Sequence, residues 1–315
     1  MDKITIGNSD MSVAPMGVGT MAWSNSRWWG YGDKLKRPDV AAAFKESVAA
    51  GLALFDTAEI YGRGTSEHVL GELIRAESAP VYIATKYAPS PARFSARALD
   101  KALDKSLKRL GVDKVDLYQI HFPSGWIKIE ALMDALADAV EAGRVCYVGV
   151  SNYSADQMRR AHVALAKRGV PLVSNQVEYS LVQRGPELNG VLAACRELNV
   201  TLIAYSPLGR GVLTGKYWPG ANARDMRRFS IAYFRPERLA AAMPIIEALK
   251  EIGAAHGDKT PSQVALNWLA RQPGVLPIPG AKNEKQARQN AESINWEMTD
   301  EEAQRLNEVS LAFRK

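Results

Sequence analysis

Cysteine is scarce in this chain. Only two of the 315 residues are cysteine, Cys146 and Cys195, and each lies among apolar neighbours. Two cysteines cannot form the disulfide framework of a small secreted protein, so both are interpreted as small core residues. The first residues also lack the apolar stretch of a secretory signal. The sequence therefore predicts a protein of a reducing compartment, the cytoplasm.

Long apolar runs and clustered charge are absent as well. No run approaches the roughly 20 apolar residues that span a bilayer, so no membrane partner is expected. The chain carries 40 basic and 34 acidic residues, a net charge of +6. Because the basic residues are scattered among acidic ones, no nucleic-acid partner is expected either. A mild positive charge suits a phosphate-bearing ligand.

What the sequence does have is a regular alternation of short β-branched runs and longer amphipathic segments, with no linker between them. The short runs predict eight buried parallel strands, at 15–20, 53–56, 81–86, 115–121, 145–150, 172–176, 201–205 and 275–278. Helices are expected between the strands, among them 96–110, 130–141, 154–167 and 187–198. Eight strand–helix pairs in about 280 residues favour an α/β fold of the closed (β/α)8 TIM-barrel type over an open sheet.

Helix boundaries carry recognisable signals. Ser154 with Gln157, and Thr260 with Gln263, fit the capping box that starts a helix. Two segments fall outside the eight units. Residues 3–13 are expected to form a β-hairpin across the barrel bottom, and 299–312 an extra C-terminal helix. The whole chain, 1–315, is therefore predicted to be a single barrel domain.

Polar residues end six successive predicted strands, at the edge where a barrel of this type builds its active site. One polar residue at a strand end is commonplace, whereas six in succession, including an acid, a lysine and a histidine, indicate a functional site. These strand ends are Asp56, Lys86, His121, Ser151-Asn152, Asn175-Gln176 and Tyr205-Ser206.

The residue types at these positions suit one kind of chemistry. Tyr61 follows Asp56 closely, and a lysine beside a phenol lowers the phenol's pKa from about 10. An aspartate beside Lys86 keeps that lysine charged, and His121 can hydrogen-bond a substrate oxygen. Together the four form a general acid for protonating an alkoxide after hydride delivery from a cofactor to a carbonyl. No metal site is predicted.

The chain resembles the aldo-keto reductase family along nearly its whole length. The resemblance implies an NADPH-dependent oxidoreductase that reduces the carbonyl of a small aldehyde or ketone to an alcohol. Any one matching segment is moderately specific, and their order and spacing together are highly specific. The segments are 55–62, Ser66-Glu67, 84–86, 117–121, 149–153, 175–177, 204–209, 213–217 and 278–282.

The resemblance also implies a role for each site residue. Tyr61 is the expected proton donor, Lys86 and Asp56 tune it, and His121 positions the carbonyl. Lys282 is the candidate for the 2′-phosphate that distinguishes NADPH (NADP+). The expected cofactor contacts are Thr20, Met21 and Asp56 near the nicotinamide, Ser151, Asn152 and Gln176 at its amide, Tyr205 on its ring, Ser206, Pro207, Leu208, Gly209, Arg210 and Lys216 at the pyrophosphate, and Gly280, Lys282, Gln286, Gln289 and Asn290 around the adenosine.

Aromatic residues crowd two of the loops that follow strands, which predicts an apolar substrate cavity. The expected wall consists of Trp23, Trp28, Trp29, Phe122 and Trp126. Residues 28–31 and the long stretch 209–236 are similar to a branch of the family that includes plant-type pyridoxal reductases. Reduction of methylglyoxal or of sugar aldehydes stays open.

Two alternatives to a reductase compete with this reading. The resemblance reaches the potassium-channel β-subunits, so a cofactor-binding regulatory subunit with vestigial reductase activity is one alternative. Lys86 at a strand end could instead attack a carbonyl as a Schiff-base lysine. The presence of Asp56 and Tyr61 at their spacing argues against the Schiff-base lysine. The rate of turnover with good aldehydes would distinguish a reductase from a regulatory subunit. The oligomeric state stays open.

Overall fold

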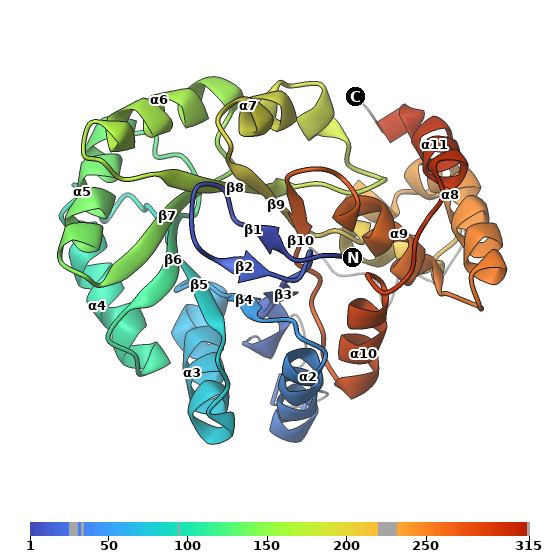
Figure 1. The fold of residues 1–315 in the computed structure, drawn as a ribbon, viewed down its shortest axis with the longest axis horizontal. Coiled ribbons are helices and arrows are strands. Elements are labelled where there is room, and N and C mark those ends of the chain that lie inside the picture. The colour runs from blue at the N-terminus through green and yellow to red at the C-terminus, as the bar shows by residue number, and fades with distance from the viewer. Residues whose placement is uncertain (25–30, 33–34, 94, 220–231, 314–315) are drawn as a thin grey trace.

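Eight parallel strands form a closed ring in the computed structural model, which describes residues 1–24, 31–32, 35–93, 95–219 and 232–313 (Figure 1). Each strand pairs with its neighbours in chain order, so the predicted (β/α)8 barrel is confirmed. The strands are β3 (Val18–Gly19), β4 (Leu54–Asp56), β5 (Tyr82–Tyr87), β6 (Val115–Ile120), β7 (Val145–Ser151), β8 (Leu172–Glu178), β9 (Thr201–Tyr205) and β10 (Val275–Pro277).

The ring closes between its first and last strands. The N–H of Gly17 donates to the carbonyl of Pro277 and that of Gly19 to the carbonyl of Pro279, both at 3.0 Å. A Cβ on Gly19 would lie 3.0 Å from the carbonyl oxygen of Ile278, so a larger residue would crowd this seam. The first strand is only two residues long, shorter than the predicted 15–20.

Helices surround the ring (Figure 1). Both predicted capping boxes are present, with Ser154 and Thr260 each accepting the N–H of the glutamine three residues on. The segment predicted at 187–198 is a helix only from Val191, because Gly190 with a φ of +79° precedes it. The helices are α2 (Arg37–Ala49), α3 (Thr65–Glu77), α4 (Ala98–Leu110), α5 (Ile129–Glu141), α6 (Ala155–Ala166), α7 (Val191–Glu197), α8 (Pro236–Ala255), α9 (Pro261–Ala270), α10 (Glu284–Glu292) and α11 (Asp300–Val309).

The two segments outside the ring lie where the sequence predicts them. Strands β1 (Ile4–Thr5) and β2 (Ser12–Val13) pair as an antiparallel hairpin across the barrel. The N–H of Gly7 in this hairpin donates to Thr201 Oγ1, at the first residue of β9, over 2.8 Å. The hairpin therefore covers the end at which the strands begin. Helix α11 lies outside the ring, beside α8 (Figure 1).

Side chains alternate between the two faces of each strand, and this alternation divides the interior into an apolar floor and a polar mouth. Tyr82 and Ala84 of β5 belong to the apolar cluster inside the barrel, together with Ile6 and Met11 of the hairpin. Lys86, two residues further along β5, is the next inward position and reaches the carboxylate of β4. The polar site thus lies at the opposite end from the hairpin.

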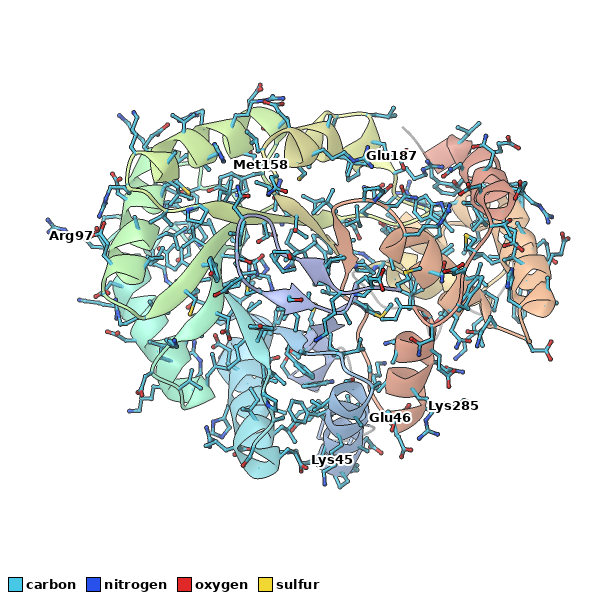
Figure 2. The ribbon with its side chains drawn as sticks, in the orientation of Figure 1. Lys45, Glu46, Arg97, Met158, Glu187 and Lys285 are labelled. Carbon is cyan, nitrogen blue, oxygen red and sulfur yellow. The ribbon has the colours of Figure 1, made fainter. Side chains whose placement is uncertain are left out.

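Charged side chains cover the outer faces of the helices. Figure 2 shows Lys45, Glu46 and Lys285 where α2 and α10 run side by side. Arg288 Nε of α10 donates to Glu46 Oε1 of α2 at 2.7 Å. Within the described residues, no helix combines the length and the apolar character needed to cross a bilayer.

Helices α3 and α4 approach each other closely at Gly71. A Cβ on Gly71 would lie 2.1 Å from the carbonyl oxygen of Leu110. We expect Gly71→Ala to lower the free energy of unfolding by about 1–3 kcal/mol, because the strain outweighs alanine's better helix propensity. Gly185→Ala is the matched control, since nothing lies within 4 Å of the added carbon. Urea unfolding midpoints measure both, and an unchanged midpoint for Gly71→Ala would contradict the close approach.

Candidate active site

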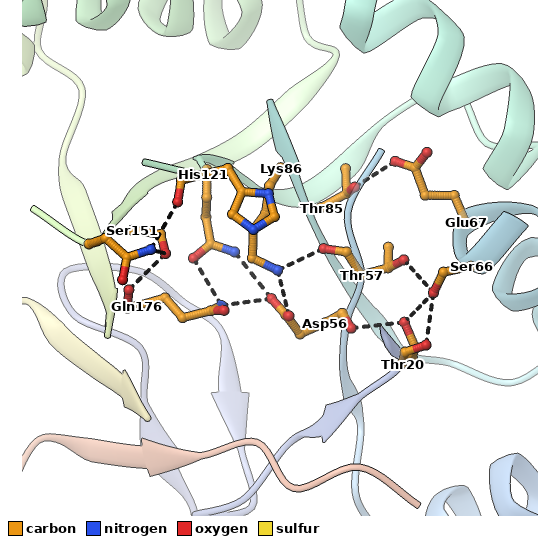
Figure 3. Close-up of polar contacts among 12 residues, drawn as sticks. Thr20, Asp56, Thr57, Ser66, Glu67, Thr85, Lys86, His121, Ser151 and Gln176 are labelled. Carbon is orange, nitrogen blue, oxygen red and sulfur yellow. Dashed lines mark hydrogen bonds and ion pairs between the residues drawn. The ribbon is translucent and has the colours of Figure 1, made fainter. Parts of the chain in front are cut away.

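A buried ion pair joins the ends of two neighbouring strands. Lys86 Nζ lies 2.5 Å from Asp56 Oδ1 and also donates to the carbonyl of Thr57 at 2.8 Å (Figure 3). The two charged side chains are almost completely shielded from solvent. Buried charges of this kind persist only when they are paired and their remaining hydrogen-bonding positions are satisfied.

Two glutamine side chains satisfy the second carboxylate oxygen of Asp56. Gln176 Nε2 donates to Asp56 Oδ2 at 2.8 Å and Gln119 Nε2 does so at 3.3 Å. The resemblance places Gln176 at the nicotinamide amide, and here its amide group is turned toward Asp56. The sequence analysis did not predict Gln119 as a site residue. Because side chains alternate along β6, Gln119 points inward like His121, two residues further on, and this pattern could have identified it. Three donors thus fix the orientation of this carboxylate.

Tyr61 and His121 lie beside the ion pair. The N–H of Tyr61 donates to the carbonyl of Ala58 at 3.0 Å, which closes a turn directly after β4. Lys86 Nζ is 5.1 Å from the centre of the Tyr61 ring. The Tyr61 and His121 rings meet edge to face with their centres 5.7 Å apart. The structure therefore brings the four predicted catalytic residues together, although they come from three separate strand ends.

Burial controls the ionisation of Tyr61 and His121. Desolvation and the charge of Asp56 raise the pKa of Tyr61 well above its usual value of 10. The expected lowering of this pKa by Lys86 is not found, because burial and the charge of Asp56 dominate. Desolvation and the charge of Lys86 lower the pKa of His121 to about 3. At neutral pH the site thus presents a protonated phenol and an uncharged imidazole.

Ser151, Asn152 and Tyr205 form a small polar cluster next to His121. Asn152 Nδ2 donates to the carbonyl of His121 and to Ser151 Oγ, each at 3.1 Å. The hydroxyl of Tyr205 donates to Asn152 Oδ1 at 3.1 Å. Asn152 has a φ of +60°, so the chain turns sharply where β7 ends. The resemblance implies that these three residues contact the nicotinamide.

Buried hydroxyl groups surround the main chain at Asp56. Thr20 Oγ1 donates to the carbonyl of Asp56 at 2.9 Å and lies 2.7 Å from Ser66 Oγ, which accepts from Thr57 Oγ1 at 2.9 Å (Figure 3). All these hydroxyls are buried. Thr20, expected beside the nicotinamide, therefore has its hydroxyl engaged inside the protein, whereas the neighbouring Met21 is exposed.

A second carboxylate lies on the outer face of β5. Glu67 of α3 is buried and accepts from Thr85 Oγ1 at 2.6 Å and from Arg109 Nε at 2.6 Å. Burial lowers the pKa of Lys86, and the charge of Asp56 and, to a smaller extent, that of Glu67 act in the opposite direction. The sequence shows Ser66-Glu67 only as a segment that matches the family, and no role was predicted for Glu67.

The chain turns sharply after β9. Ser206, Gly209, Arg210 and Gly211 have positive φ angles, from +50° to +109°, and the last three begin the short helix η4 (Gly209–Thr214). Within this turn the N–H groups of Gly209 and Gly211 donate to the carbonyls of Ser206 and Leu208, at 2.9 and 3.0 Å. A Cβ on Gly209 would lie 2.2 Å from Val182 Cγ2, so glycine is needed here. The resemblance implies that this turn contacts the pyrophosphate of the cofactor.

The residues expected around the adenosine lie along α10 and just before it. The N–H of Lys282 donates to Gln286 Oε1 at 2.9 Å, and Asn290 Nδ2 donates to the carbonyl of Gly280 at 3.3 Å. Gln289 lines an open cavity of about 710 Å³ between α10 and α2. Lys216, expected at the pyrophosphate, is exposed in the chain after η4.

The expected aromatic wall divides into two parts. Trp23 is fully buried and donates its indole N–H to the carbonyl of Ala281 at 2.7 Å, which assigns it to the core rather than to an open wall. Phe122 lies against His121 with ring centres 5.7 Å apart, and Trp126 is exposed. Trp28 and Trp29 lie outside the described residues.

Comparison with known proteins agrees with this geometry. The model of the aldo/keto reductase family matches residues 15–311, so the chain belongs to that family. A chloroplastic pyridoxal reductase of Arabidopsis thaliana is 37% identical over 96% of this chain and 84% of its own length. The aldo-keto reductase yakc [NADP(+)] of Schizosaccharomyces pombe is 35% identical over 85% of this chain and 81% of its own.

The fold comparison leads to the same family. An aldo-keto reductase from Klebsiella pneumoniae, solved in complex with NADPH, has a TM-score of 0.77 and 26% identity, with 98% of this chain and 95% of that chain covered. The protein is therefore an oxidoreductase of a family that reduces carbonyl groups, built on the barrel that its relatives share.

The depressed pKa of His121 predicts a loss of stability in acid. Between pH 6.5 and about 3 the unfolded chain binds a proton at this histidine and the folded chain does not. The stability due to neutral His121 is therefore complete above pH 6.5 and declines as the pH falls. We expect the wild type to lose about 2 kcal/mol more than His121→Gln between pH 7 and pH 5. Urea unfolding at the two pH values measures this, and parallel losses would contradict it.

Proposed function

We propose that this protein uses NADPH to reduce an aldehyde or ketone to an alcohol, with Tyr61 as the general acid. The observation that carries the proposal is the buried Lys86–Asp56 pair with the Tyr61 ring 5.1 Å from its ammonium group. A buried, paired cation beside a protonated phenol is suited to a reaction in which negative charge develops on an oxygen close to both groups.

The proton donor and its partner have complementary protonation states. Because its pKa is raised, Tyr61 keeps its proton at neutral pH until a strong base, such as an alkoxide oxygen, takes it. Neutral His121 can hydrogen-bond the same oxygen without competing for that proton. The charge of Lys86 then favours the phenolate that the transfer leaves behind. Asp56 holds Lys86 in place and keeps it charged.

The cofactor site is proposed to run from His121 to α10. When bound, NADPH supplies the hydride that reduces the carbonyl carbon. Ser151, Asn152 and Tyr205 would hold the nicotinamide end. The left-handed turn at 206–211 would hold the pyrophosphate, and Lys282 with the residues of α10 the adenosine phosphate. The NADPH complex of the Klebsiella relative and the NADP(+) in the name of the yeast relative support this cofactor.

The first substrates to test follow from the relatives and from the mouth of the barrel. The Arabidopsis relative is named a pyridoxal reductase, so pyridoxal is the first carbonyl in the panel. Ile60 and Trp126, on the loops after β4 and β6, are exposed apolar residues. They favour a substrate with an apolar or aromatic body next to its carbonyl group.

The experiment that tests the proposal follows absorbance at 340 nm with NADPH or NADH and a panel of pyridoxal, aromatic aldehydes, methylglyoxal and sugar aldehydes. Rapid consumption of NADPH, slower with NADH, is the expected result. Tight NADPH binding with no turnover on any carbonyl would overturn the reductase and favour a cofactor-binding regulatory subunit.

Tyr61→Phe removes the proposed acid while keeping the ring. We expect carbonyl reduction to fall by a factor of about 10² to 10⁴, because that range is the usual contribution of a general acid. NADPH affinity, measured by fluorescence titration, should stay within about twofold. Normal turnover in this variant would show that the proton comes from another group.

A further inference from the structure

The turn that carries Tyr61 contains a buried carboxylate. Glu59 lies two residues before Tyr61 and is only 8% exposed. Its Oε1 accepts the N–H of Ala88 at 2.8 Å, and the two terminal nitrogens of Arg93 donate to its two oxygens, one of them at 2.9 Å. Glu59 therefore links the loop after β4 to the loop after β5 by a bidentate ion pair, the geometry in which arginine binds a carboxylate most strongly.

Arg93 has further contacts that extend this link. Its Nη1 donates to the carbonyl of Ala88 at 3.0 Å, and its guanidinium lies 5.0 Å from the centre of the buried Tyr87 ring. The main-chain carbonyl of Arg93 accepts the indole N–H of Trp126 at 3.4 Å. Trp126 belongs to the loop after β6, so contacts of one residue connect three consecutive loops of the barrel mouth.

We propose that Arg93 is a positioning residue that locks the Tyr61 turn and Trp126 into one wall of the substrate site, and that this wall selects carbonyl compounds with an aromatic body. The proposal rests on the proposed function for its substrate. Trp126 and Ile60, which are 48% and 50% exposed, supply the apolar surface of this wall. Trp126 is held by the main-chain carbonyl of Arg93. Ile60 is held indirectly, because it follows Glu59 in the chain and Glu59 binds the Arg93 side chain.

The physical reason is the cost of an unpaired buried charge. Among the described contacts, removing the Arg93 side chain leaves Glu59 with one donor, the main-chain N–H of Ala88. One N–H does not compensate the desolvation of a carboxylate, so the turn has to open until water reaches Glu59. Opening this turn moves Ile60 and Tyr61, because the N–H of Tyr61 is bonded inside it.

The test compares Arg93→Gln with a matched arginine elsewhere. We expect Arg93→Gln to raise the KM of an aromatic aldehyde at least tenfold and that of a short aliphatic aldehyde less than threefold. Because Tyr61 moves, kcat should fall for both aldehydes, while NADPH affinity should stay within about twofold. Arg144→Gln is the control, because the Arg144 side chain is 26% exposed against 29% for Arg93 and is also paired with carboxylates, Asp100 and Asp104. Arg144 precedes β7 at the opposite end of the barrel and should leave both KM values unchanged.

A second variant separates positioning from a general loss of structure. In the double variant Glu59→Gln/Arg93→Gln the uncompensated charge is gone, so the KM of the aromatic aldehyde should recover most of the way to the wild-type value. Equal rises for both aldehydes, or a double variant as impaired as Arg93→Gln, would overturn the proposal.

Hydrogen exchange gives a readout that does not depend on the reaction. In Arg93→Gln, the amides of 58–63 and 122–127 should exchange at least tenfold faster than in the wild type, and those around β7 should not change. If the wild type reduces no carbonyl but this pattern appears, the proposed function fails while the lock stands. Unchanged exchange in both segments would overturn the lock itself.

Discussion

The ion pair between Lys86 and Asp56 is the interaction on which the rest of the active site depends. A lysine with no access to solvent has to meet its counter-charge at close range, and the parallel pairing of β4 with β5 places the two side chains within 2.5 Å of each other. The carboxylate in turn needs its second oxygen satisfied, which explains the amide groups of Gln119 and Gln176. Two of the polar side chains in the barrel mouth are thus donors that the buried pair requires.

The same pair sets the protonation of its neighbours in opposite senses. Asp56 adds to the burial that raises the pKa of Tyr61, and Lys86 adds to the burial that lowers the pKa of His121. Each partner therefore suppresses the charged form of one neighbour: the phenolate by the aspartate and the imidazolium by the lysine. At neutral pH neither the phenol nor the imidazole of this site therefore carries a charge.

The barrel and the grouping of the four proposed catalytic residues could be predicted because both follow from local patterns. Strands and the polar residues that end them can each be predicted from a short segment of sequence, and closure of the ring places those strand ends together. Contacts between segments that are distant in the sequence could not be predicted in this way. Trp23 is buried because its indole N–H reaches the carbonyl of Ala281, far away in the chain. The rise of the Tyr61 pKa was missed for the same reason, since desolvation depends on packing that no short motif encodes.

Because side chains alternate along β5, a second buried carboxylate, Glu67, lies behind the strand and away from the barrel mouth. Lys86 points inward to Asp56, while the preceding Thr85 points outward and donates to Glu67. Glu67 is itself held by Arg109. Burial lowers the pKa of Lys86, and the charges of Asp56 and then Glu67 act in the opposite direction. Because a strand places neighbouring residues on opposite faces, one short segment of β5 contacts both carboxylates, Asp56 through Lys86 and Glu67 through Thr85. The carboxylates that act on Lys86 therefore lie on both faces of the strand, and the outer one lies within the packed layer between barrel and helices.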